Sequence, residues 1–141
     1  MAAYYTKLNV SFKEFMMHEY IYNISAISNG ILNVPKIIFY NVDTFEMTME
    51  KIDQMNVADL YGEAACHTPP ELFAQIRDVI RFLYENHVIY PDITGYNFIE
   101  TEDKLWIIDF EHSDFKTHRP DLFVERFIGD EECYEWNAWF A

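Results

Sequence analysis

Glycine, cysteine and basic residues are scarce in this chain of 141 residues. Its four glycines, Gly30, Gly62, Gly95 and Gly129, are so far apart that no G-x-G-x-x-G phosphate-binding loop can exist. Ten lysines and arginines stand against 24 acidic residues, which gives a formal net charge of −14. Such a charge repels phosphate backbones and anionic lipid surfaces, so nucleic acid and membranes are not expected as direct partners. A nucleotide held through Mg²⁺ remains compatible with it.

The two cysteines, Cys66 and Cys133, indicate free thiols in a reducing compartment, because no secretory signal is recognisable at the start. A single disulfide between them stays open. No apolar run approaches the length of a membrane span, and no Pro/Gly/Ser-rich linker or internal repeat divides the chain. Half of the residues are hydrophobic and 18% are aromatic. We therefore expect one cytoplasmic (intracellular) globular domain over residues 1–141 with a sizeable core.

Two short β-prone runs mark the most informative stretch, residues 87–112. Phe98-Ile99 and residues 105–108 (LWII) are separated by the polar segment 100–104 (ETEDK), a pattern that predicts two strands joined by a tight turn. Asp92 and Asn97 precede the first strand, and Asp109 follows the second. In a hairpin these positions lie at the same end, so the three polar side chains are expected to converge.

Asn and Asp oxygens suit Mg²⁺, which prefers carboxylates, waters and substrate phosphates as ligands. Asn97 and one of the two aspartates could therefore hold the metal, and the other aspartate could orient an attacking hydroxyl or accept its proton. A hairpin in which Asp92 and Asn97 merely form turns is the alternative.

Residues 90–97 (YPDITGYN) resemble the H-R-D-x-x-x-x-N catalytic loop of protein kinases, and residues 109–111 (DFE) resemble their D-F-G. The spacing from Asp92 to Asn97 is the five residues that the family requires. The resemblance implies an α+β, two-lobe protein-kinase-like fold that uses ATP and Mg²⁺. It also implies that Asn97 and Asp109 are the metal ligands and that Asp92 is the catalytic residue.

The first half of the chain follows the order of a kinase small lobe from its lysine strand onward. Residues 2–8 read as a strand carrying Lys7, and Ser11 begins a capping box (S-x-x-E) for a helix that ends at Asn29-Gly30. The apolar face of this helix is predicted from helical spacing and comprises Phe15, Met16, Tyr20, Ile24 and Ile27. Residues 36–40 and 45–50 then read as two strands.

By this resemblance Lys7 is the phosphate-contacting lysine and Glu19 is its helix partner. The segment Met49, Glu50 and Lys51 resembles the hinge whose backbone meets adenine. Residues 1–52 would thus form a reduced small lobe of one strand, one helix and two strands.

Residues 53–141 are expected to form a truncated, mostly helical large lobe that carries the hairpin. A short helix is predicted over residues 57–61. A long one follows a second capping box at residues 68–71 (TPPE) and ends near Asn86-His87. Residues 110–118 read as a loop. Residues 120–127 and 131–140 read as short helices, with an aromatic face of Tyr134, Trp136, Trp139 and Phe140 that packs in the core or binds a partner.

Departures from the kinase pattern keep two functions open. Tyr90 and Pro91 replace the His and Arg of H-R-D, and Glu111 replaces the glycine of D-F-G. One hypothesis is a minimal phosphotransferase that uses Mg-ATP to phosphorylate a protein or small-molecule hydroxyl. The other is a pseudokinase that acts as a protein-binding module or as a decoy of another kinase.

Two weaker site patterns are present in the sequence as well. His112, His118 and Cys133 could bind a transition metal, but their spacing matches no zinc motif. Paired carboxylates of the glycosidase type are conceivable, yet chance pairs are common in a chain with so many acids.

Overall fold

The computed structural model describes residues 3–117 and 119–140. Ala2, in the first predicted strand, and His118, in the transition-metal pattern, lie outside these ranges. The elements in chain order are β1 Tyr4–Lys7, α1 Phe12–Ile24, β2 Ile37–Asn41, β3 Glu46–Glu50, α2 Val57–Tyr61, α3 Pro70–Glu85, β4 Val88–Ile89, β5 Phe98–Glu100, β6 Leu105–Ile107, β7 Asp114–Phe115 and α4 Leu122–Gly129. Short 3₁₀ turns occupy Ser25–Ile27, Ala65–His67 and Gly95–Asn97.

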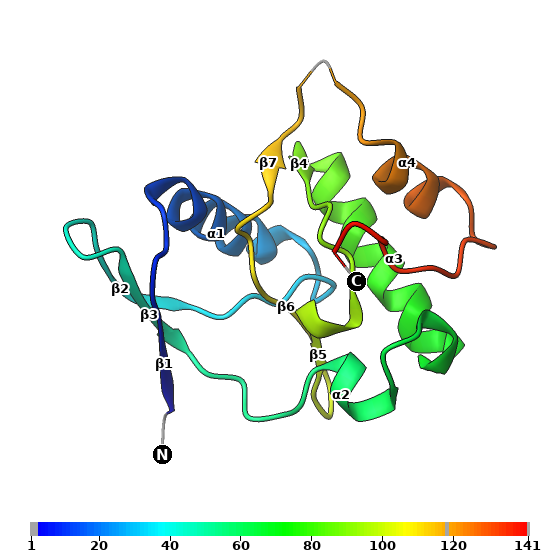
Figure 1. Ribbon diagram of the computed structural model, residues 1–141, viewed down its shortest axis with the longest axis horizontal. Helices are drawn as coiled ribbons and strands as arrows, with labels where there is room; N and C mark the ends of the chain where they lie inside the picture. The colour runs from blue at the N-terminus through cyan, green and yellow to red at the C-terminus, as the bar shows by residue number, and fades with distance from the viewer. Residues whose placement is uncertain (1–2, 118, 141) are drawn as a thin grey trace.

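A three-stranded antiparallel sheet and α1 form one side of the molecule, as predicted for the small lobe (Figure 1). The strand order is β1-β3-β2, and Lys7 on β1 lies opposite Met47 on β3. Val10, Met47 and Met49 form a small buried cluster of their own, against which Phe15 of α1 packs. The sheet thereby fixes Lys7 beside α1.

Helix α1 buries a face that differs from the predicted one. Ser11 caps the helix by accepting a hydrogen bond from the Glu14 amide, but the Glu14 carboxylate pairs with Lys7 and does not close a capping box. The buried positions are Glu14, Met17, His18 and Ile21, whereas Met16 and Ile27 of the predicted face are 48% and 67% exposed. Phe15, Tyr20 and Ile24 of the predicted face are partly buried against the core, so the prediction was right in part. Glu14 and His18 were not predicted, because hydrophobic spacing does not identify polar members of a buried face.

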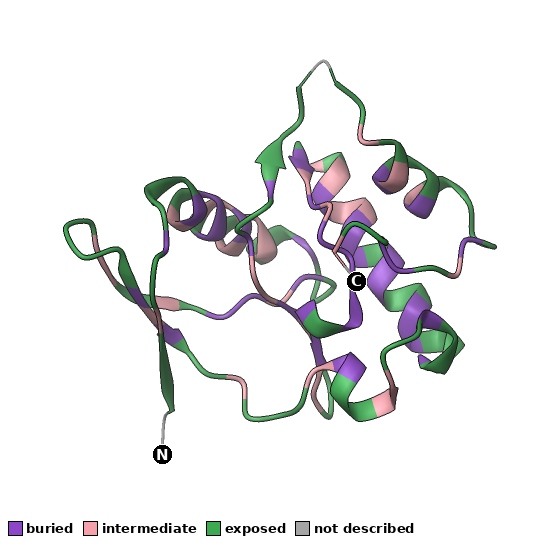
Figure 2. Cartoon of the chain, viewed as in Figure 1, coloured by how far each residue is buried: buried purple, intermediate pink, exposed green. Residues whose placement is uncertain are grey.

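The other side of the molecule is built around α3, and the hairpin β5–β6 lies between the two sides (Figure 1). The main core joins α1, α3, the hairpin and α4 in one cluster of buried side chains. Figure 2 shows buried positions concentrated along α3 and the hairpin, whereas β1 is exposed. Helix α3 begins after Pro69, one residue later than the capping box at Thr68 predicts, and Thr68 makes no cap hydrogen bond.

Arg77 of α3 holds the chain that follows α4. Its side chain is 5% exposed, and its guanidinium donates hydrogen bonds to the backbone carbonyls of Phe127, Asp130, Glu131 and Cys133. The planar five-donor head of arginine suits such a set of acceptors. This anchor keeps an irregular segment packed against the large lobe.

The C-terminal segment departs from the predicted helices after α4. Residues 131–140 form turns and extended chain, although the aromatic residues Tyr134 and Trp136 do pack on Phe73 of α3. Trp139 is 90% exposed. The predicted loop over residues 110–118 contains β7, which pairs antiparallel with β4.

Both cysteines are free, as expected, with Cys66 exposed and Cys133 buried. Within the described ranges, none of the helices combines the length and apolar character needed to cross a bilayer.

Candidate functional site

The end of the β5–β6 hairpin brings Asn97 and Asp109 together, as predicted. Phe98 pairs with Ile107 in the antiparallel ladder, so the residue before β5 and the residues after β6 lie at one edge. The Ile108 amide donates to the Asn97 carbonyl at 3.0 Å. The neighbouring Asp109 adopts a left-handed backbone with φ of 64°, which is uncommon for a residue with a side chain.

Asp92 approaches the same edge from the loop that follows β4. The Asn97 side-chain amide donates to the Asp92 backbone carbonyl at 2.9 Å, which ties the loop to the hairpin. Asp92 itself is 7% exposed. Burial raises the pKa of its carboxyl and the charge of Asp109 adds to the rise, while a hydrogen bond from His112 opposes it. A buried carboxylate of raised pKa suits proton acceptance.

Tyr90 and Phe110 pack in the core next to the Asp92 loop and Asp109. The Tyr90 hydroxyl donates to the Ile108 carbonyl at 2.6 Å, next to Asp109. Both side chains are fully buried, and their rings meet edge to face at a centroid distance of 5.8 Å. Tyr90, at the position of the H-R-D histidine, thus connects the loop to the start of the D-F-E segment.

Lys7 joins the small lobe to the hairpin through two carboxylates. Its Nζ lies 2.6 Å from Glu14 Oε2 and 3.3 Å from Asp109 Oδ1. Burial alone would lower the pKa of Lys7, but the two carboxylates outweigh it and raise the pKa above its usual value. Burial also raises the pKa of Glu14, against the effect of Lys7.

The prediction that Glu19 pairs with Lys7 is wrong, because Glu14 forms the ion pair with Lys7. Successive residues of an α-helix are separated by about 100°, so Glu19 lies roughly 140° around α1 from Glu14. Glu19 is exposed on the outer face of the helix, where it lines a groove along β2.

A cavity of about 250 Å³ opens beside Lys7, between the sheet and the hairpin. Its apolar walls include Met47, Met49, Ile99 and Ile108, and its polar walls include Lys7, Glu14 and Asp109. The volume is close to the lower end of the range for ligand pockets, about 300–1,000 Å³. The cavity thus combines apolar walls with charged side chains.

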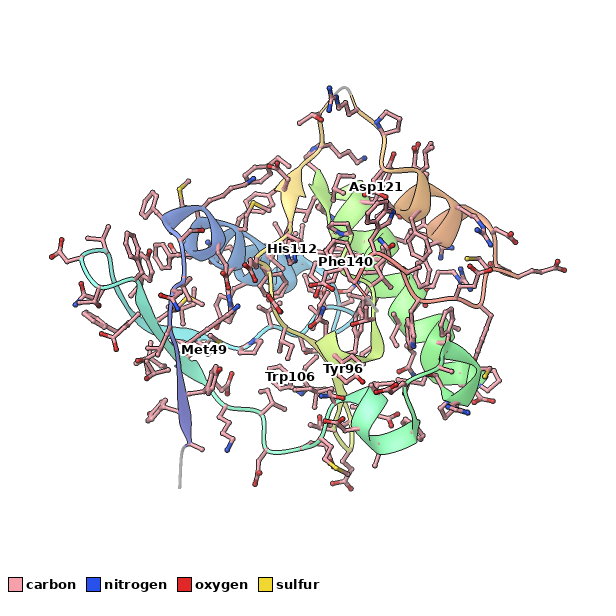
Figure 3. The ribbon with its side chains drawn as sticks, viewed as in Figure 1. Met49, Tyr96, Trp106, His112, Asp121 and Phe140 are labelled. Carbon is pink, nitrogen blue, oxygen red and sulfur yellow. The ribbon has the colours of Figure 1, made fainter. Side chains whose placement is uncertain are left out.

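The predicted hinge residues Met49, Glu50 and Lys51 all line this cavity (Met49 is labelled in Figure 3). The Glu50 and Lys51 amides already donate to the backbone carbonyls of Lys36 and Ala3, at 2.9 and 3.0 Å. The backbone groups of Glu50 and Lys51 that could bind a nucleotide base are therefore their carbonyl oxygens.

The donor set at the hairpin edge fits Mg²⁺. The Asn97 amide nitrogen is engaged with Asp92, which leaves the amide oxygen as a ligand. Asp109 pairs with Lys7 through Oδ1, and Oδ2 has no protein partner among the described residues. Mg²⁺ is commonly held by one or two protein oxygens together with substrate phosphates, so this pair suffices.

The transition-metal pattern finds no support in the part of the chain that the structure describes. No group of three His, Cys, Asp or Glu side chains there could hold a metal ion. Cys133 is 2% exposed in the core, and His112 contacts Asp92.

Sequence reasoning did not assign Glu14, His18 or His112 to this site. Glu14 and His18 recur with Met17 and Ile21 at helical spacing, a signal visible only if polar residues are allowed on the buried face. His18 lines the cavity, donates from Nε2–H to the Pro35 carbonyl at 2.7 Å, and meets Phe110 edge to face. The sequence singled out His112 only as part of a transition-metal pattern, because its contact with Asp92 depends on the fold of the segment after β6.

Comparison with solved structures supports the fold. The kinase PK-1 of the Cydia pomonella granulovirus superposes with a TM-score of 0.57 at 15% sequence identity, over 82% of this chain and 46% of that one. At this identity the likeness concerns the fold alone, and it agrees with the protein-kinase-like, α+β fold that the sequence predicts.

Sequence comparison reaches the family. The EKC/KEOPS complex subunit BUD32 of Enterocytozoon bieneusi (strain H348) is 26% identical over 108 residues, which cover 69% of this chain and 53% of that protein. The chain thus spans about half the length of these two relatives. The family model of the RIO domain matches residues 6–124, which include Lys7, Glu14, Asp92, Asn97 and Asp109. The chain therefore belongs to the RIO domain family of atypical protein-kinase-like proteins.

Proposed function

We propose that this chain is a kinase-like phosphotransferase that binds Mg-ATP in the cavity beside Lys7 and phosphorylates a protein or small-molecule hydroxyl. The observation that carries the proposal is the ion-pair chain Glu14–Lys7–Asp109, which joins β1, α1 and the segment after β6 in the lining of the cavity. Membership of the RIO domain family supports the class of reaction.

Each charged residue has one role in the proposal. Lys7, oriented by Glu14, contacts the nucleotide phosphates. Asn97 and Asp109 hold Mg²⁺, which when bound neutralises charge on the phosphates. Asp92 orients the acceptor hydroxyl and takes its proton as the new oxygen–phosphorus bond forms. The apolar walls at Met47, Met49 and Ile99 bind the base and exclude water from it.

Release of labelled phosphate from γ-labelled ATP tests the proposal, with water as the acceptor. We expect slow, Mg²⁺-dependent hydrolysis that Asp92→Asn lowers at least about tenfold without changing the apparent affinity for ATP. Hydrolysis at an equal rate in wild type and Asp92→Asn would contradict the assigned role of Asp92.

A second function, that of a protein-binding module, is favoured by one finding. The relative BUD32 is by name a subunit of a protein complex. Exposed apolar side chains on the small lobe, including Ile38, Phe39 and Phe45, would suit a protein partner. Asp109→Asn separates the two functions. A protein-binding module should still retain its partner in a pull-down with this variant, whereas a phosphotransferase should lose its activity.

A further inference from the structure

His112 lies against the candidate catalytic carboxylate. It is the third residue after Asp109, in the segment between β6 and β7, and its Nδ1 is 3.3 Å from Asp92 Oδ2. The His112 side chain is 46% exposed and that of Asp92 is 10% exposed. One edge of the imidazole therefore faces solvent, and the other edge contacts the buried carboxylate of Asp92.

The C-terminal segment holds His112 in place. The Phe140 ring lies 4.9 Å from the imidazole centroid at an angle of 50°, and Figure 3 shows the two labelled side chains next to each other. Asn137, which is 4% exposed, fastens this segment to the Asp92 loop. Its side-chain amide donates to the Pro91 carbonyl at 2.7 Å, and its backbone amide donates to the Ile93 carbonyl at 2.9 Å.

Asp92 thus has neighbours that restrain it on two sides. Asn97 binds its backbone carbonyl, and His112 binds one oxygen of its carboxylate. A carboxylate accepts hydrogen bonds, so the matching state of His112 is the one that carries a proton on Nδ1.

We propose that His112 is a positioning residue, whose Nδ1–H fixes Asp92 Oδ2 so that Oδ1 faces the acceptor hydroxyl. The inference rests on the proposed phosphotransferase function. In the transfer step the acceptor oxygen bonds to the γ-phosphorus, the bond from that phosphorus to the bridging oxygen breaks to release ADP, and the hydroxyl proton passes to Asp92 Oδ1. Restraining the carboxylate in advance removes an ordering cost from this step.

Hydrolysis of Mg-ATP by the whole chain measures the effect. His112→Leu removes the donor, and we expect kcat to fall by about tenfold with KM for ATP unchanged, because His112 lies outside the nucleotide cavity. His112→Asn restores a short N–H donor near the position of Nδ1 and should recover most of kcat. His67→Leu, which alters an exposed histidine on another turn, serves as the control and should match wild type.

Two outcomes separate failure of this inference from failure of the proposed function. Hydrolysis that depends on Asp92 but is equal in wild type and His112→Leu overturns the positioning role alone. Hydrolysis that is unaffected by Asp92→Asn overturns the proposed function as well.

The histidine tautomer provides a readout without turnover. Long-range ¹H–¹⁵N NMR spectra of the free protein should show His112 protonated at Nδ1, and this signature should be lost in Asp92→Leu, which has no acceptor oxygen. Protonation of neutral His112 at Nε2 alone, unchanged by Asp92→Leu, would overturn the inference even for a chain that hydrolyses no ATP.

Discussion

Glu14 is the residue on which the orientation of Lys7 depends. Its carboxylate is 3% exposed and makes the shorter of the two contacts to Lys7, whereas Asp109 is 34% exposed and lies farther from the ammonium. Loss of the Glu14 charge would leave Lys7 paired to the very carboxylate that we assign to Mg²⁺. The buried contact therefore keeps Lys7 and Asp109 available for separate tasks.

Two separate substitutions of glutamates on α1 test whether Glu14 orients Lys7. Glu14→Gln should weaken binding of Mg-ATP by about tenfold or more, because a hydrogen bond to a charged group contributes about 1.5–3 kcal/mol. Glu19→Gln, on the exposed face of the same helix, should leave binding unchanged. Titration of a fluorescent ATP analogue gives both affinities, and equal effects of the two substitutions would contradict the assignment.

His18 makes stability depend on pH. Burial lowers its pKa from 6.5 to about 4, and the bond to the Pro35 carbonyl only partly offsets this. Between pH 4 and 6.5 the unfolded chain binds a proton at His18, whereas the folded chain does not. This residue therefore makes the free energy of unfolding rise as pH increases from about 4 to 6.5. A shift of this size corresponds to about 3 kcal/mol.

Replacement by His18→Gln, which keeps a donor for the Pro35 carbonyl, should flatten that dependence. Urea unfolding at pH 5 and pH 7 measures the difference in free energy of unfolding. The raised pKa values of Glu14 and Asp92 act in the opposite direction and remain in the variant. If wild type and His18→Gln lose equal stability between pH 7 and pH 5, the lowered pKa of His18 is not the cause.

At the scale of elements, α2 supports the turn that presents Asn97. A Cβ atom at Gly95 would lie 3.1 Å from the Ala58 backbone nitrogen and 3.2 Å from its Cβ. Both contacts are tighter than side chains normally make, and the neighbour is a helix backbone that cannot yield easily. Glycine at position 95 thus permits α2 to pack directly on the 3₁₀ turn Gly95–Asn97.

Gly95→Ala should push this turn away from α2. We expect a loss of about 1–2 kcal/mol in the free energy of unfolding, within the usual cost of overpacking, and a fall in Tm of about 3–8 °C. Gly129→Ala is the matched control, since nothing lies within 4 Å of a Cβ at that position. Calorimetry measures both Tm values. Equal values for the two variants would show that a Cβ atom so close to Ala58 does not lower the free energy of unfolding.

Elements with a strong local signal were predictable from the sequence. The hairpin β5–β6 follows from two β-prone runs around a polar turn, and its geometry alone brings Asn97 and Asp109 to one edge. Helix α3 follows from its apolar spacing, although its first residue was misplaced by one. The face of α1 was not predictable from hydrophobicity, because Glu14 and His18 are buried through partners that lie far away in the sequence.

The C-terminal segment shows a second limit of local patterns. Its aromatic residues suggest a helix, yet Arg77 and Asn137 hold it as irregular chain through bonds to backbone carbonyls. Such bonds depend on long-range packing, so neither the path of this segment nor the contact between His112 and Asp92 could be predicted.

At the scale of the whole molecule, one continuous core joins the two sides around the cavity. The cluster contains Met17 and Ile21 of α1 as well as residues of α3, the hairpin and α4. Asn33, in the connection from α1 to β2, accepts a backbone hydrogen bond from Ile107 of β6 at 3.0 Å. A ligand bound in the cavity therefore contacts both sides at once, and its binding should stabilise the fold as a unit.

Thermal unfolding with and without Mg-ATP tests the central claim most directly. A ligand present at 100 times its Kd that binds only the folded state adds about 2.7 kcal/mol of stability, which corresponds to a rise in Tm of about 5–10 °C for a chain of this size. We predict a rise that requires ATP and Mg²⁺ together and that disappears in Asp109→Asn. An unchanged Tm in millimolar Mg-ATP, or an equal rise in Asp109→Asn, would contradict the nucleotide site proposed here.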